Sequence, residues 1–351
     1  SKHLSYGGLS VIAVSSQLIN IGVTLLCIFN GASYFSMAYG LAAGEIWRTC
    51  LFYFYAKRDF FLMPSFTNMR EILKSGVFVS LGNLFKRFSL MSFVLIIGRL
   101  GTTKEVALNS RAVGFGDFIV NVTTMGISSF ALSYIAKEKN EDGNVPLAFT
   151  RATNVMLSLV WPALTIAVVL KDELIMVFFG EQWGFSASLF PGIAVWMMLS
   201  SVWALSTSMY IANNAEKFRA YKELFLLLIT VVTVYLAYPY GLSAIAYSMI
   251  LVGCVDLLVN LFALKYIARL SMRTFLVSIS NNVIMTLCVG AWAYLLKLYV
   301  DVDNAFLTVI VVAALSLPIW IGCMKLVRLE LYTEISKVFV KLTALNTKPL
   351  L

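Results

Sequence analysis

The sequence predicts an all-α integral membrane protein, a polytopic bundle of about ten transmembrane helices. Sixty per cent of its 351 residues are hydrophobic and only 13% are charged, whereas about a quarter of the residues in soluble domains are charged. Apolar runs near the length of a membrane span recur along the whole chain, and about twenty such residues cross the hydrocarbon as a helix. A transmembrane barrel would instead show short segments of alternating polarity.

Ten spans are expected in order along the chain, separated by turn-forming residues such as Gly31, Gly101, Gly180 and Gly241. Their approximate ranges are 9–29, 34–56, 74–98, 108–134, 152–170, 187–212, 222–239, 241–264, 274–297 and 304–326. The segment after the last span, 327–351, mixes apolar residues with lysines. It is interpreted either as a short helix on the cytoplasmic membrane surface or as an unstructured end.

Basic residues predict the orientation of these spans. If the first span begins in the cytoplasm, nineteen of the 27 Lys and Arg residues fall on the cytoplasmic side and four on the other, with four inside spans. This asymmetry follows the positive-inside rule and places both ends of the chain in the cytoplasm. The net charge of +9 therefore reflects orientation and gives no reason to expect nucleic-acid binding.

Two neighbouring spans carry polar residues at helical spacing. On the third span these are Gly76, Ser80, Asn83 and Arg87, with Lys86 beside them, and on the fourth they are Ser110, Gly114, Asp117, Asn121, Thr124 and Ser128. Steps of three and four align such residues on one helix face, and lipid does not tolerate a polar face. The pattern predicts a wet, cationic cavity and favours a transporter of a polar, anionic substrate.

Lys86 and Arg87 are the strongest candidates for substrate binding. A cation at the bilayer centre costs about 2.5–3.5 kcal/mol on insertion scales, and guanidinium groups suit phosphate. The alternative is a structural ion pair with a buried carboxylate such as Asp117. Arg111, near the outer start of the next span, either extends the cationic path or anchors its helix at the interface.

The neutral polar residues Asn83, Asn121 and Thr124 would suit a hydroxyl-rich ligand, and they would suit helix–helix hydrogen bonding almost as well. Asp117 is interpreted as a counter-charge or as part of a sugar-binding surface, and less readily as an ion-coupling site. Asp256, which has no partner nearby in the sequence, is a weaker candidate for ion coupling.

Glu45 and Arg48 lie three residues apart near Gly40 and Gly44, a spacing that favours a structural pair on one helix. Glu45 is nevertheless kept as a third ion-coupling candidate. In the first span, Ser16, Asn20 and Thr24 also share a face. That face is either another cavity wall or a surface for helix packing.

The residues that most enzymes use are scarce. The one histidine is His3, so no histidine-based triad or zinc motif lies in the membrane. The five cysteines fit no metal motif or disulfide framework. We therefore expect no catalytic residues, no metal and no cofactor, although a membrane-embedded polysaccharide polymerase or ligase remains the rival from another class.

Four short segments of the chain carry motifs of a known family. They are residues 64–79, Leu95-Ile-Ile-Gly-Arg-Leu-Gly101, Asn109-Ser-Arg-Ala112 and Val177-Phe-Phe-Gly-Glu-Gln-Trp183. In this order they resemble the polysaccharide and oligosaccharyl-lipid flippase branch of the multidrug/oligosaccharidyl-lipid/polysaccharide exporter superfamily. The first two resemble the start and the end of that family's seventh helix, the third the opening of its eighth helix, and the fourth the outer loop before its tenth.

The resemblance implies a fourteen-helix, two-lobe transporter of which the first four helices are missing. Residues 1–58 would then belong to the first lobe, 70–266 would form a six-helix second lobe, and 274–326 would be two additional helices. The implied function is flipping of undecaprenyl-pyrophosphate-linked oligosaccharide to the outer leaflet of the bacterial inner membrane, for surface polysaccharide export. Polymerases and glycosyltransferases would be partners.

One departure from the family concerns ion coupling. Many members have an aspartate a few residues before the Leu-Ile-Gly-Arg motif, where this chain has Ser92 and Phe93. A coupling role assigned to that acid does not carry over. The closest rival is a cation-coupled multidrug exporter of the same superfamily, but Lys86 and Arg87 would repel its cationic substrates.

Overall fold

The structure, a computed structural model, describes residues 6–31, 34–55, 69–140, 144–299 and 304–327. Within these ranges the chain is helical with short turns and contains no strand. It divides into two compact units, Ser1–Met69 and Arg70–Leu351. The predicted tail, from Arg328 onward, lies outside the described residues.

The first unit is a hairpin of helices α1 (Tyr6–Phe29) and α2 (Phe35–Tyr55). The two helices approach closely because glycines of α2 lie against the polar face of α1. A Cβ atom on Gly40 would overlap the hydroxyl of Thr24, and one on Gly44 would lie 3.0 Å from the carbonyl oxygen of Ser16. The face that carries Ser16, Asn20 and Thr24 is therefore a helix-packing surface, which was one of its two interpretations.

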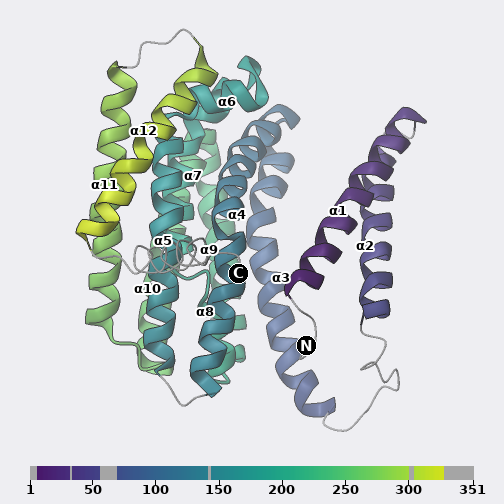
Figure 1. Ribbon diagram of the computed structural model, residues 1–351, viewed down its shortest axis with the longest axis vertical. Coiled ribbons are helices and arrows are strands. Elements are labelled where there is room, and N and C mark those ends of the chain that lie inside the picture. The colour runs from purple at the N-terminus through teal and green to yellow at the C-terminus, as the bar shows by residue number, and fades with distance from the viewer. Residues whose placement is uncertain (1–5, 32–33, 56–68, 141–143, 300–303, 328–351) are drawn as a thin grey trace, which may run out of the picture. The chain divides into compact units, whose positions relative to one another are not determined.

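The second unit contains the remaining helices (Figure 1). They are α3 (Met69–Leu100), α4 (Thr103–Asn140), α5 (Val145–Val169), α6 (Lys171–Phe179), α7 (Gly184–Ser201), α8 (Ser206–Ala212), α9 (Glu216–Ala237), α10 (Leu242–Ile267), α11 (Met272–Tyr299) and α12 (Ala305–Leu326). Short 3₁₀ turns at Glu181–Trp183 and Tyr238–Tyr240 precede α7 and α10. All ten predicted spans are helical, and the fold is an all-α membrane bundle.

Eight segments of the described chain are long and apolar enough to cross a membrane. Two predicted spans, α2 and α4, fall outside this set. Helix α2 carries Glu45 and Arg48, and α4 carries Arg111, Asp117 and several neutral polar residues. A polar face was predicted on α4, whereas on α2 only the pair of Glu45 and Arg48 was predicted. Polar residues of either kind lower the mean hydropathy of a helix.

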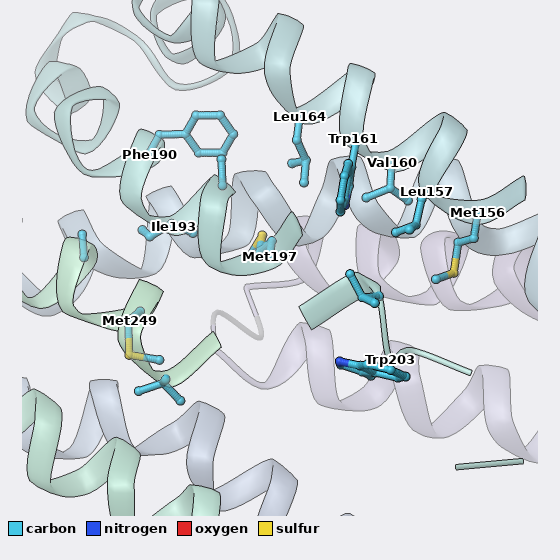
Figure 2. Packing of buried hydrophobic residues seen from close by; sticks show 14 of the residues in the cluster. Met156, Leu157, Val160, Trp161, Leu164, Phe190, Ile193, Met197, Trp203 and Met249 are labelled. Atoms are coloured by element: carbon cyan, nitrogen blue, oxygen red, sulfur yellow. The ribbon is translucent and has the colours of Figure 1, made fainter. Parts of the chain in front are cut away.

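The core of the second unit lies around α7, which packs against both α5 and α10 (Figure 2). Leu157, Val160, Trp161 and Leu164 line one side of α5 at spacings of three and four, and belong to one cluster with Phe190, Ile193 and Met197 of α7 and Met249 of α10. The indole N–H of Trp161 donates to the carbonyl oxygen of Met198 at 3.0 Å and to the hydroxyl of Ser201 at 3.1 Å. Its one polar atom is thus satisfied inside the bundle.

The predicted sixth span, 187–212, lies within one segment that is long and apolar enough to cross a membrane, Glu181–Ala212, but residues 202–205 divide its helix into α7 and α8. At this break the amide of Trp203 bonds to the carbonyl of Ser200, three residues back. The indole ring stacks against Phe149 of α5 and Phe275 of α11 at centroid distances of 6.3 and 5.0 Å, and these two rings also stack on each other at 6.1 Å. Tertiary stacking therefore accompanies the interruption of an otherwise apolar run.

The two C-terminal helices pack on the same unit. Asn282 of α11 donates from its side-chain amide to the amide oxygen of Asn154 of α5, and both side chains are buried. At the end of α11, the Lys297 ammonium lies 2.8 Å from the Glu173 carboxylate of α6 and also donates to the carbonyl of Val169. Polar contacts at two levels thus tie α11 to α5 and α6.

Candidate functional site

The two predicted cavity cations lie near the middle of α3, within the span Gly76–Leu100. Both Lys86 and Arg87 are exposed. Among the described residues, none forms an ion pair or a hydrogen bond with either side chain. Asp117 is also exposed, so the alternative of a sealed ion pair between this carboxylate and the α3 cations is not formed in the part of the chain described.

The polar face predicted on α4 is the exposed face of that helix. Ser110, Gly114, Asp117 and Asn121 are all exposed, and Thr124 is half-buried with its hydroxyl bonded to the carbonyl of Val120 at 2.7 Å. The opposite side of α4 packs into the core, where a Cβ atom on Gly116 would overlap the Met197 side chain. The side chain of Ser128 lies outside the described residues.

Arg111 lies between aromatic rings near the start of α4. Its guanidinium carbon is 5.4 Å from the ring centroid of Phe179 and 5.0 Å from that of Trp183. Cation–π contacts of this kind hold a guanidinium without neutralising its charge. The geometry leaves both interpretations of Arg111 open, because an interfacial anchor and a binding cation would each use such a contact.

Asn83 is turned toward α9. Its amide oxygen accepts a hydrogen bond of 2.7 Å from Nη2 of Arg219, and Nη1 of the same side chain lies 3.5 Å from the carbonyl oxygen of Val79. Ser89 adds a second link, a 2.9 Å hydrogen bond to the hydroxyl of Thr230. Asn83 thus joins α3 to α9, and a role for it in substrate binding stays a prediction.

A cluster of buried charges joins α9 to α10. The Lys222 ammonium lies 2.9 Å from Oε1 of Glu223 and 3.1 Å from Oδ1 of Asp256. Asn260 donates to the same Asp256 oxygen at 2.6 Å and accepts a 2.8 Å hydrogen bond from the hydroxyl of Tyr210. Asp256 therefore has an ammonium partner that its sequence neighbours did not reveal, and its role in ion coupling stays a prediction.

Sequence reasoning missed this cluster because it assigned Arg219 and Lys222 to a cytoplasmic connection. The predicted span began at residue 222, whereas α9 begins at Glu216 and buries both cations. Adjacent opposite charges at positions 222 and 223, followed by an acid in the middle of the next span, were the available signal. Buried charges in a bundle are paired, and this rule predicts a partner for Asp256.

Glu45 and Arg48 form the pair predicted for them on α2. Nη1 of Arg48 lies 3.3 Å from Oε1 of Glu45, and both side chains are exposed. The same guanidinium lies over the ring of Phe52 at 6.0 Å. An exposed pair of this type contributes little to stability, and ion coupling through Glu45 stays a prediction.

Comparisons with known proteins agree with this architecture. The chain is 19% identical over 305 residues to the teichuronic acid biosynthesis protein TuaB of Bacillus subtilis (strain 168), which covers 84% of this chain and 61% of that protein. Among solved structures it resembles the lipid II flippase MurJ in an inward closed conformation, with a TM-score of 0.66 at 14% identity, covering 89% of this chain and 66% of that one.

The chain thus spans less than two thirds of the length of either protein. The likeness to MurJ establishes a shared fold. The eight apolar segments long enough to cross a membrane support a multi-pass membrane protein. The family described as "Polysaccharide biosynthesis protein" matches residues 1–188, more than half of the sequence. On this match, the chain belongs to the polysaccharide biosynthesis protein family.

Proposed function

We propose that this protein moves a lipid-linked oligosaccharide from the cytoplasmic to the outer leaflet of the bacterial inner membrane. The carrier lipid is undecaprenyl pyrophosphate, and transport proceeds by alternating access without covalent chemistry. Family membership and the fold shared with a lipid II flippase support this assignment. Polymerases and glycosyltransferases of the same pathway are the expected partners, and both ends of the chain are expected in the cytoplasm.

The proposal rests mainly on the position, exposure and charge environment of Lys86 and Arg87. Two cations lie halfway along an apolar helix, exposed and without a carboxylate partner among the described residues. In lipid, each would cost about 2.5–3.5 kcal/mol on insertion scales. A water-filled cavity removes that cost, and a pyrophosphate group entering the cavity would exchange its hydration for charge-assisted hydrogen bonds.

In the proposed cavity the α4 face would oppose these cations. Lys86 and Asp117 lie about equally far along the chain from the turn at Gly101, which supports a similar membrane depth for the two residues. Asn121 and Thr124 continue the α4 face toward the other end of the helix. Their amide and hydroxyl groups would bind sugar hydroxyls, while the polyprenyl chain stays in lipid.

The test replaces Lys86 and Arg87 together with glutamine in a strain whose surface polysaccharide depends on this protein. Glutamine keeps hydrogen-bonding capacity but removes the charge. Hydrogen bonds to charged groups contribute about 1.5–3 kcal/mol each, so removal of both cations should slow export at least about tenfold. Lipid-linked oligosaccharide should accumulate in the cytoplasmic leaflet.

Arg99→Gln is the matched control. Arg99 is an exposed cation at the end of the same helix, where water is accessible, so its loss should leave export near the wild-type rate. If the double variant exports polysaccharide at the wild-type rate and at normal abundance, the pyrophosphate role of Lys86 and Arg87 is wrong.

A further inference from the structure

A cavity of about 340 Å³ opens between α4 and the short helix α6. It is lined by Ser110, Arg111, Gly114, Phe115, Phe118, Phe178 and Phe179. The aromatic rings pack on one another, with Phe115 6.1 Å from Phe178 and Phe118 6.2 Å from Phe178 between centroids. The cavity is therefore an aromatic pocket with one cationic side chain in its lining.

The Arg111 guanidinium is available to an anion. Two rings hold it by their faces, and among the described residues no carboxylate pairs with it. A guanidinium that stacks on rings keeps its in-plane N–H groups free to donate, and their fork matches the oxygen atoms of a phosphate. Charge complementarity thus selects a ligand with an anionic head.

The floor of the pocket is open. No atom lies within 4 Å of the position that a Cβ on Gly114 would occupy. Gly114 and Ser110 also belong to the exposed polar face of α4, so the pocket borders that face directly. The pocket is therefore continuous with the polar face of α4 at these two residues.

We propose that this pocket binds the phosphate end of a polyprenyl-phosphate lipid. Arg111 binds the phosphate, and the first part of the hydrocarbon chain lies among Phe115, Phe118 and Phe178. This inference rests on the proposed function and, with the predicted orientation, places a release subsite at the depth of the outer leaflet. Pockets for small ligands measure about 300–1,000 Å³. This one therefore suits a phosphate and a short length of one chain better than a two-chain phospholipid.

The test measures binding of farnesyl phosphate and of farnesol to the purified full chain in phosphatidylcholine nanodiscs. The phosphate should bind at least about tenfold more tightly than the alcohol, because hydrogen bonds to charged groups are lost with the phosphate. Arg111→Gln should remove this difference by weakening only the phosphate. Gly114→Leu should weaken both ligands because its side chain fills the floor.

Gly322→Leu on α12 is the matched control, since a Cβ there also meets no atom within 4 Å. Equal affinities for phosphate and alcohol, or equal effects of the two leucine variants, would overturn the inference. So would displacement of farnesyl phosphate by phosphatidylglycerol at equal mole fraction, which would assign the pocket to bulk lipid. None of these outcomes bears on export by the Lys86 and Arg87 variant, so the two proposals fail separately.

Discussion

Replacing Lys222 with methionine would leave two carboxylates close together inside the bundle. The ammonium lies 2.9 Å from Glu223 and 3.1 Å from Asp256, and only 4% of the Lys222 side chain is exposed. Methionine nearly preserves the length of the aliphatic chain, so packing changes little while the charge is lost. The measured effect would therefore report mainly on electrostatics.

The expected cost follows from burial. Removing one partner of a buried ion pair destabilises proteins by about 3–5 kcal/mol, because the remaining charge is left uncompensated. Taking the lower end of about 2–4 °C per kcal/mol, the unfolding temperature should fall on the order of 6–10 °C. Lys171→Met removes the partner of Asp172 from a more exposed pair, and such pairs are worth about 0–1 kcal/mol.

The assay is thermal unfolding of the purified protein in detergent at one fixed heating rate, since irreversible unfolding makes the midpoint depend on that rate. The double variant Lys222→Met with Asp256→Asn should unfold at a higher temperature than Lys222→Met alone because the carboxylate repulsion is removed. If Lys222→Met unfolds within about 2 °C of Lys171→Met, by the same conversion, the reasoning about a buried charge balance is refuted.

Two further substitutions test helix packing. Gly40→Leu should reduce the yield of folded, monodisperse protein, because the new side chain would collide with Thr24. Gly22→Leu is the control, since a side chain there meets no atom within 4 Å and should leave the yield unchanged. Equal yields of the two variants in size-exclusion chromatography would contradict the close approach of α1 and α2. Asn154→Leu should lower the unfolding temperature because the buried Asn282 amide loses one of its two acceptors and keeps only the carbonyl oxygen of Ser278. Adding Asn282→Leu should recover most of the lost unfolding temperature, because replacing both partners of a buried hydrogen bond is nearly neutral. If the two substitutions lower the unfolding temperature additively in the double variant, the result would argue against that bond.

Helix positions were predictable from local chemistry. Gly180 and Gly241 both adopt positive φ values, 94° and 91°, and each lies in a connection that the sequence predicted between two spans, although the short helix α6 before Gly180 was not predicted. Glycine has no Cβ atom to oppose this conformation, so a glycine between two apolar runs marks a turn. The polar face of α4 was predictable for a similar reason, since helical periodicity is a property of the sequence alone.

What could not be predicted depends on contacts between distant segments. Residues 193–212, which include Trp203, contain no proline or glycine, and the break there coincides with stacking on rings from two other helices. Arg219 resembles a loop cation until the side chain of Asn83 is placed next to it. The periodicity of one helix does not specify which neighbour faces its polar groups.

The cluster around Lys222 also bears on how transport would respond to voltage. Arg219 also interacts electrostatically with Glu223 of this cluster. With Arg219 included, Lys222, Glu223 and Asp256 give two positive and two negative charges, so their sum is zero. A charge crossing the full membrane potential changes energy by about 2.3 kcal/mol per 100 mV, but a neutral group that moves as one body contributes almost nothing. Any voltage dependence of transport would therefore report on the cargo and the unpaired cations of α3, and not on this cluster.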